Sequence, residues 1–374
     1  MMDQRPSVHP DRLPADSISH VVCVYRRFYL RMGYLIALFA APLAVSCGGS
    51  EPPALEEEAA AEPTAATAIG EIVRIDPRIE TLVQDDAVIE KLAEGFAFIE
   101  GPVWDRQNSR LLFSDVRGNE IYQWNEADGV STFIDPVFEG DRSGTRSVSS
   151  NGLTLDAEGR LIICEHGNRR ISRLEEDGSR TVVVEAYEGR QLNSPNDAVF
   201  ASDGSLYFTD PPYGLEGLEE SPARELDFNG IYRLRPDDEL ELLVRDQTRP
   251  NGIALSPDEG TLYVANSDAE NKVWMAYDLD EDGASNARVF YDVNDQTDPG
   301  AADGMKVDLA GNLFATGPGG VWIIAPDGTH LGTIKTGEIT ANVGWGDDGH
   351  TLYMTSSTSL YRVRLSTEGH VPGP

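Results

Sequence analysis

Six segments of the chain begin with a side chain that can offer an oxygen atom to a ligand. Their first residues are Glu100, Asn151, Asn196, Asn251, Asp303 and Asn342. Carboxylates and amides without histidine or cysteine suit a hard cation, because Ca²⁺ takes roughly 6 to 8 oxygen ligands whereas Zn²⁺ prefers nitrogen and sulfur. The ligand types therefore favour Ca²⁺, and Mg²⁺ or Mn²⁺ would also be compatible with them.

Each of these residues taken singly has an ordinary structural explanation. Asn-Gly and Asp-Gly pairs are common where a strand begins or a chain turns. That explanation does not require a glutamate at position 100, and it does not account for the same position being polar in six segments. The set as a whole therefore indicates a shared site.

The six segments are copies of one unit. Asn151-Gly-Leu-Thr-Leu-Asp-Ala-Glu-Gly-Arg-Leu, for example, matches Asn251-Gly-Ile-Ala-Leu-Ser-Pro-Asp-Glu-Gly-Thr-Leu. The copies start at 100, 151, 196, 251, 303 and 342, so 39 to 55 residues separate them, which is about the span of a four-stranded propeller blade. Each copy reads as a strand, a turn with Gly or Asp, and a second strand. The predicted fold class is all-β, as a six-bladed β-propeller.

The repeat also predicts where the polar residues meet. In every unit the turn lies at the far end of the first strand, so the leading residue lies at the near end. Rotational repetition then brings all six near ends to the same mouth of a central channel. The segment from about 79 to 98 is expected to add a strand to the last blade and close the ring, which removes its exposed edges.

Five stretches resemble the SMP-30/gluconolactonase/luciferin-regenerating family. They are Glu100-Gly-Pro-Val-Trp, Ser194-Pro-Asn-Asp, Arg249-Pro-Asn-Gly, Ala302-Asp-Gly-Met and Cys164-Glu-His-Gly-Asn-Arg-Arg, and the similarity extends over nearly all of residues 95 to 366. The resemblance implies that Glu100, Asn251 and Asp303 bind one divalent metal ion. It implies two alternative roles for Asn196, as a metal ligand or as a substrate contact. It also implies that Asp303 is the general base, although a carboxylate in contact with a cation is a weak base.

Further residues are expected to contact a polyhydroxylated substrate at the same mouth. Asn151 and Asn342 belong to the converging set, while His166 and Arg169 follow the second strand of their blade. Tyr213, in a Pro-Pro-Tyr-Gly loop, is expected to stack on a sugar ring. The alternatives are a histidine packed in the core and a rigid turn that carries a packed tyrosine.

The composition and the absence of certain motifs argue against several classes of partner and of enzyme. The chain has 63 acidic and 30 basic residues, a formal net charge of -33, which would repel phosphate backbones, so no nucleic-acid partner is expected. Cys23, Cys47 and Cys164 are too few and too scattered for a disulfide framework or a zinc site. No nucleophile elbow, dinucleotide fingerprint or phosphate loop occurs in the sequence.

The N-terminal region, residues 1–47, has the features of an export segment. Arg26, Arg27 and Arg31 precede an apolar run over 33–45, which has the length of a signal-peptide core and is short for a spanning helix. The run ends at Ala-Val-Ser-Cys47, which resembles a lipobox, so a lipid anchor at Cys47 and an exported, periplasmic or membrane-tethered location are expected. Plain cleavage and an uncleaved anchor are the alternatives.

The remainder divides into a linker and a folded domain. Residues 48–71 are rich in Glu, Ala and Pro and nearly free of large apolar side chains, which predicts a disordered linker. Residues 72–374 are expected to form the propeller.

The function predicted from these features is metal-dependent hydrolysis of a sugar lactone to the aldonic acid. The cation would polarise the lactone carbonyl while a water near Asp303 attacks it. One alternative keeps the site and changes the substrate to an organophosphate, an aryl ester or another lactone. A second alternative is a non-catalytic binding propeller, against which the pairing of Glu100 with Asp303 argues.

Overall fold

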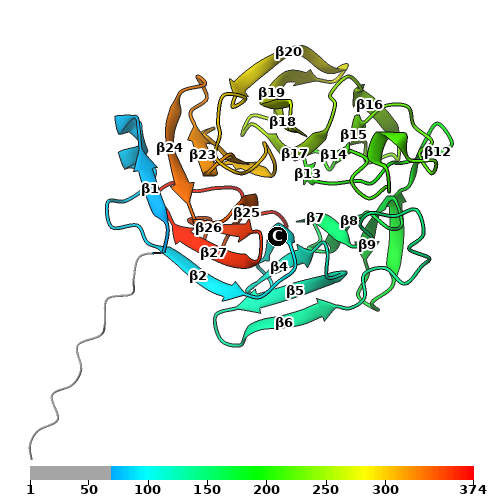
Figure 1. The fold of residues 1–374 in the computed structure, drawn as a ribbon, viewed down its shortest axis with the longest axis horizontal. Coiled ribbons are helices and arrows are strands. Elements are labelled where there is room, and N and C mark those ends of the chain that lie inside the picture. Colours follow the sequence, from blue (N-terminus) through cyan, green and yellow to red (C-terminus); the bar gives the residue numbers. More distant parts are fainter. Residues whose placement is uncertain (1–68) are drawn as a thin grey trace, which may run out of the picture. The chain divides into compact units, whose positions relative to one another are not determined.

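The computed structural model describes residues 69–374. Figure 1 shows these residues as antiparallel sheets set around a central axis, and within this range they form the six blades of a β-propeller. The predicted fold class is confirmed. The expected export segment, the lipid attachment at Cys47 and nearly all of the expected linker lie outside the described residues.

Every blade contains four antiparallel strands that run in order from the axis outward, and blade 5 has a fifth strand outside them. The innermost strands of blades 1 to 6 are β3 (Ile99–Asp105), β7 (Ser150–Leu155), β13 (Ala198–Phe200), β17 (Pro250–Leu255), β21 (Met305–Val307) and β25 (Thr340–Gly346). The second strands are β4 (Arg110–Asp115), β8 (Leu161–Glu165), β14 (Leu206–Asp210), β18 (Thr261–Asp268), β22 (Leu313–Gly317) and β26 (Thr351–Ser356). The third strands are β5 (Glu120–Asn125), β9 (Arg170–Leu174), β15 (Gly230–Leu234), β19 (Asn271–Asp280), β23 (Gly320–Ile324) and β27 (Ser359–Arg364). The outer strands are β6 (Gly129–Ile134), β10 (Arg180–Val184), β16 (Leu240–Val244), β20 (Gly283–Asp292), β24 (His330–Lys335) and β2 (Ile89–Glu94).

The ring is closed by a strand from the N-terminal side of the domain. β2 precedes blade 1 in the sequence and pairs with β27 as the outer strand of blade 6. The closing strand that the segment 79–98 was expected to provide is therefore present. β1 (Glu71–Arg74) pairs with β24 as a fifth strand of blade 5, which the sequence did not indicate. It begins one residue before the predicted start of the domain at 72.

The hydrophobic core lies between neighbouring blades. Val103 and Leu112 of blade 1 pack with Leu153 and Ile163 of blade 2, and all four side chains are buried. Successive side chains of a strand point to opposite faces of the sheet. Each face of a blade therefore carries apolar side chains that can pack against the neighbouring blade. Packing between blades thereby fixes how closely the inner strands approach the axis.

Glycine after the leading residue permits this close approach. Each inner strand contacts the inner strand of the next blade around the whole ring. Gly152 N donates to Asn196 O at 2.7 Å, and a Cβ atom on Gly304 would lie 2.0 Å from Cγ of Asn342. A larger residue at these positions would push neighbouring blades apart.

The turn between the first two strands of a blade lies at the other end of the channel. In blade 5, Asp308 Oδ1 accepts from the backbone N–H of Ala310 at 3.0 Å and of Asn312 at 2.7 Å. Gly311 there has a φ of 88°, a conformation that favours glycine. The Asp and Gly of the repeat thus stabilise turns at the end opposite to the leading residues.

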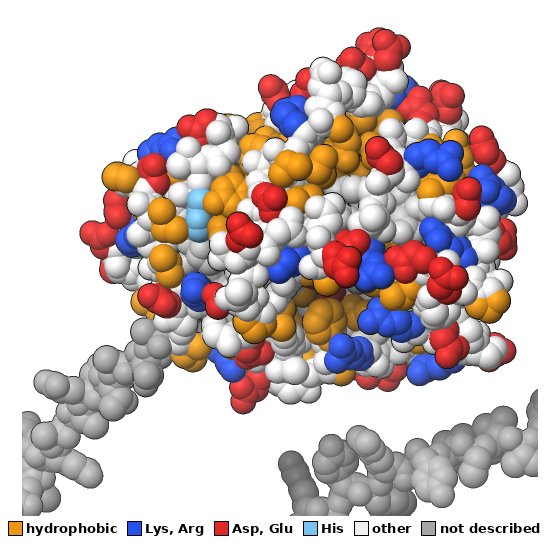
Figure 2. All heavy atoms as spheres, turned by 45° about the horizontal axis from the view of Figure 1, so that its top comes forward, with side chains coloured by type: hydrophobic (Ala, Val, Ile, Leu, Met, Phe, Trp, Pro, Cys, Tyr) orange, Lys and Arg blue, Asp and Glu red, His pale blue; other side chains and the backbone are white. Residues whose placement is uncertain are grey.

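The remaining elements are short. They are the 3₁₀ helices η1 (Pro77–Thr81) and η2 (Leu218–Glu220) and the hairpin β11 (Ala186–Tyr187) and β12 (Arg190–Gln191). Among residues 69–374, none of the helices is both long and apolar enough to span a membrane. Figure 2 shows Asp and Glu side chains dispersed among Lys and Arg side chains on one face of the molecule.

Candidate functional site

The six leading residues lie at the same end of the six inner strands. Glu100, Asn151, Asn251 and Asn342 are within β3, β7, β17 and β25, and Asn196 and Asp303 precede β13 and β21. All are buried except Asp303, which is partly buried. The structure therefore brings together the residues that the repeat predicted to meet.

The carboxyl group of Glu100 lies near a side chain of blade 6. The side chain of Asn342 lies near the carboxyl groups of Glu100 and Asp197 and favours their charged forms, and Gly101 N donates to Glu100 Oε2 at 3.1 Å. Burial, followed by the nearby charge of Asp197, raises the pKa of Glu100 to about 7. Asn342, expected to contact substrate, lies beside these carboxylates.

Asp303 lies between Glu100 and Asn251. Burial and the charge of Glu100 raise the pKa of Asp303 well above its ordinary value, and a hydrogen bond from Asn251 opposes that rise. Asn251 Nδ2 also contacts Ser267 Oγ at 3.3 Å. A bound cation would reverse the effect of burial, because it favours the charged carboxylate.

Several buried polar atoms around the mouth have no hydrogen-bond partner among the described residues. They are Ser149 Oγ, Asn151 Oδ1, both ring nitrogens of His166, Asp197 Oδ2 and Asp303 Oδ1. Buried polar atoms in proteins are nearly always bonded, so a cluster of unpaired ones indicates where a ligand would bind. The oxygen atoms in this set are the kind that a hard cation takes.

The carboxylates alone would not complete a metal site. Within residues 69–374, no group of three or more His, Cys, Asp or Glu side chains is close enough to hold a metal ion. A cation held by Glu100 and Asp303 would need amide oxygens as further ligands. Asn196 and Asn251, from blades 3 and 4, are the predicted sources of those oxygens.

The sequence analysis missed two charged residues near the site. Asp197 is 1% exposed, and Lys306 Nζ lies 3.7 Å from Asp197 Oδ2. One signal could have revealed Asp197, because it follows a leading residue where four other copies have glycine.

His166 lies beneath two loops at the mouth. It is 1% exposed, and burial, together with the charge of Arg146, lowers its pKa to about 4, so the ring is neutral near pH 7. The loop 135–149 and the loop 211–229 join above it, with Arg146 N donating to Gly214 O at 2.9 Å. A neutral imidazole can both donate and accept, which suits a substrate hydroxyl.

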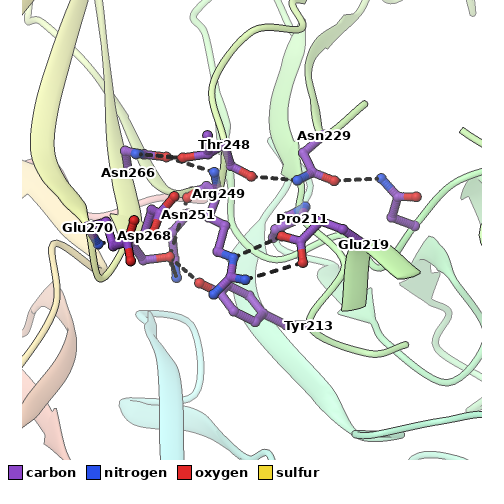
Figure 3. A network of polar contacts seen from close by, with 12 residues as sticks. Pro211, Tyr213, Glu219, Asn229, Thr248, Arg249, Asn251, Asn266, Asp268 and Glu270 are labelled. Atoms are coloured by element: carbon purple, nitrogen blue, oxygen red, sulfur yellow. Dashed lines mark hydrogen bonds and ion pairs between the residues drawn. The ribbon is translucent and has the colours of Figure 1, made fainter. Parts of the chain in front are cut away.

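Tyr213 extends from the loop 211–229 toward blade 4. Its hydroxyl shares a hydrogen bond with Ser267 Oγ (Figure 3). In the same view, Arg249 forms a two-pronged ion pair with Glu219, with N–O distances of 2.9 and 3.2 Å. Arg249 directly precedes the Pro250-Asn251 pair, so this contact fixes the loop to the strand that carries a predicted metal ligand.

Arg169 has a different role from the predicted substrate contact. Its Nε donates to the carbonyl oxygens of Leu192 at 2.7 Å and Asn193 at 3.1 Å, and its Nη1 donates to that of Ala223 at 2.7 Å. These donors are used on backbone carbonyl groups, so the side chain ties the segment 192–193 to the loop that contains Ala223. The position in a loop after β8 was evident from the sequence, but the direction of the side chain was not.

These features define a class of protein, a six-bladed propeller with a buried, oxygen-lined site where its inner strands begin. The chain belongs to the SMP-30/Gluconolactonase/LRE-like family, whose conserved region matches residues 98–358. A gluconolactonase of Zymomonas mobilis is 40% identical over 313 residues, which cover 80% of this chain and 88% of that protein. A 6-deoxy-6-sulfogluconolactonase of Pseudomonas putida is 36% identical over 271 residues, 69% of this chain and 82% of that protein. The solved structure of a gluconolactonase from Xanthomonas campestris matches with a TM-score of 0.70 and 30% identity, covering 82% of this chain and 99% of that one.

Proposed function

We propose that this chain hydrolyses a sugar lactone to the corresponding aldonic acid, with one divalent cation bound at the mouth of the propeller. The chain is a hydrolase of cyclic esters, in keeping with relatives at 40% and 36% identity that are named as lactonases. Glu100, Asn251 and Asp303 would hold the cation, with Asn196 as a fourth ligand. Ca²⁺ is the first choice, because the donors are all oxygen atoms.

One observation carries this proposal. Glu100, Asn251 and Asp303 come from blades 1, 4 and 5, yet Glu100 and Asn251 both lie close enough to Asp303 to shift its pKa. Two carboxylates so close together, one buried and one partly buried, cost free energy when both are charged, and a divalent cation would offset that cost. When bound, the cation would supply an electrophile that polarises the lactone carbonyl.

The chain's own residues would supply the remaining steps. Asp303 Oδ1 is buried and has no partner among the described residues, so it can accept a proton from the attacking water. His166 and Asn151 carry unpaired polar atoms at the same mouth and would bind sugar hydroxyls. The loops around Gly214 would limit the entry of other water molecules.

The export segment belongs to the same proposal. Residues 1–47 would direct the chain out of the cytoplasm, and Cys47 would carry a lipid that keeps the propeller at a membrane surface. The substrate would then be a lactone outside the cytoplasm.

The test is a pH-stat assay of the purified protein with glucono-1,5-lactone, before and after treatment with a chelator. We expect turnover that the chelator abolishes and CaCl₂ restores. Activity that persists after metal removal would contradict the role of the cation. Turnover of an aryl ester or an organophosphate in preference to lactones would favour the alternative substrate class for the same site.

A further inference from the structure

Asp197, which is buried, and Lys306, which is partly exposed, form an ion pair that the proposed reaction leaves without a role. Asp197 lies just before β13 in blade 3, and Lys306 lies in β21 in blade 5. The distance of 3.7 Å from Lys306 Nζ to Asp197 Oδ2 fits an ion pair but is too long for a direct hydrogen bond. The ammonium group donates instead to the carbonyl oxygen of Met305 at 2.9 Å.

Asp197 occupies a position at which the other blades avoid side chains. The residue after the leading residue is glycine in four copies, namely Gly101, Gly152, Gly252 and Gly304. Gly152 leaves room for Asp197, because a Cβ atom on Gly152 would lie 2.7 Å from Asp197 Oδ1. A carboxylate buried here is costly unless charged or polar groups pair with it. The neighbouring blade is thus shaped to accept this carboxylate.

The two oxygen atoms of Asp197 are directed to different partners. Oδ1 accepts from Ala198 N at 2.9 Å, and the side chain of Asn342 lies near the same carboxyl group and favours its charged form. Oδ2 faces Lys306 and has no hydrogen-bond partner among the described residues. Lys306 therefore faces the one oxygen of Asp197 that has no hydrogen-bond partner among the described residues.

The charges around the mouth are balanced only when Lys306 is counted. Glu100, Asp197 and Asp303 interact electrostatically with one another. A divalent cation offsets two negative charges, which leaves the third for the ammonium group of Lys306. That group also favours the charged forms of Glu100 and Asp197.

We infer that Lys306 is a positioning residue, which supplies the countercharge for Asp197 and thereby lowers the affinity of the site for a divalent cation. This inference rests on the proposed function, because the cation is part of it. Without Lys306, the site has one more uncompensated negative charge. Divalent cations would then bind more tightly.

The test is calorimetric titration of the chelator-treated, full-length protein with CaCl₂. Lys306→Met should bind Ca²⁺ more tightly than the wild type by a factor on the order of ten, since a unit charge near the cation is lost. Lys306→Arg retains the charge and should stay within about threefold of the wild type. Asp197→Asn removes a negative charge and should weaken binding on the order of tenfold.

The double variant Asp197→Asn with Lys306→Met restores the net charge, so its Kd should return to within about threefold of the wild-type value. Thermal unfolding in chelator gives a second measurement, in which Lys306→Met should have a lower Tm than the wild type and a larger rise on adding CaCl₂. A Kd in Lys306→Met that is unchanged or weaker overturns the inference, as does a Kd in Asp197→Asn that is unchanged or tighter. A wild-type protein that binds no Ca²⁺, Mg²⁺ or Mn²⁺ overturns the proposed cation site as well.

Discussion

The carboxyl groups of Glu100 and Asp303 interact although they belong to blades 1 and 5, and the charge of Glu100 raises the pKa of Asp303. Blade 6 separates the two blades in the ring, so this interaction can form only near the axis, where the inner strands converge. Asn342 of blade 6 lies near Glu100 and favours its charged form. The propeller thus brings residues that are distant in sequence to one point.

Asp303→Asn should abolish most of the lactonase activity. The amide cannot accept a proton from water, and general-base catalysis is worth about 10² to 10⁴ in rate, so kcat/KM should fall at least about a hundredfold. Asp258→Asn is the matched control, since Asp258 caps an exposed turn in blade 4, where it accepts from Gly260 N at 3.2 Å. In chelator, both variants should unfold near the Tm of the chelator-treated wild type. Retention of more than about a tenth of the activity in Asp303→Asn would exclude it as the general base.

Removal of the cation should lower the Tm of the wild-type protein. A ligand that binds only the folded state at 100 times its Kd stabilises that state by about 2.7 kcal/mol. Glu100→Gln removes one predicted ligand charge, so its Tm should respond much less to CaCl₂. Differential scanning calorimetry with and without chelator measures both effects. Equal responses in the variant and the wild type would show that Glu100 does not bind the cation.

The repeat made the fold and the convergence of the leading residues predictable. A polar residue, a strand of alternating apolar and polar residues and a turn recur six times. Six similar units arranged in a ring place the same end of every inner strand at the same side of the ring. β1 was not predictable in the same way, because its four residues, Glu-Ile-Val-Arg, carry too little pattern to reveal a partner in blade 5.

The sequence could not predict the directions in which the side chains of the site point. The sequence placed Arg169 in a loop at the mouth, but whether its guanidinium faces substrate or backbone depends on the carbonyl groups of a distant loop. Asp197 was overlooked for a related reason. Its importance comes from Lys306 in another blade, and a one-dimensional repeat does not display such a pair.

Arg249→Met should impair substrate binding more than stability. The ion pair with Glu219 is partly exposed, with side-chain exposures of 28% and 34%, so its loss should change the free energy of unfolding by less than about 1 kcal/mol. The loop that carries Tyr213 would be less well fixed, and KM for the lactone should rise severalfold while kcat stays within about twofold. Arg364→Met is the control, because it breaks an exposed pair with Asp348. A similar KM in both variants would contradict this role of the loop.

Cys47→Ser should prevent lipid attachment. Cells that express the wild-type chain and are fed radiolabelled palmitate should yield a labelled protein in the membrane fraction, and the variant should yield none. Cys23→Ser provides the control, since it lies before the apolar run and should leave labelling intact. An unlabelled wild-type protein whose N-terminus lies beyond residue 47 would instead establish plain cleavage.

His166 should make the folded protein sensitive to acid. Burial lowers its pKa from 6.5 to about 4, so between these pH values the unfolded chain binds a proton that the folded chain does not. Stability that is fully present above pH 6.5 is therefore lost as the pH falls toward 4, by at most about 3 kcal/mol for this one group. His166→Asn removes the titrating ring, so the decline in its free energy of unfolding between pH 6.5 and 4 should be smaller than in the wild type. His350→Asn, at the far end of blade 6, should decline as the wild type does. Urea unfolding at a series of pH values measures the difference, and parallel curves for His166→Asn and the wild type would mean that His166 is not held neutral by burial.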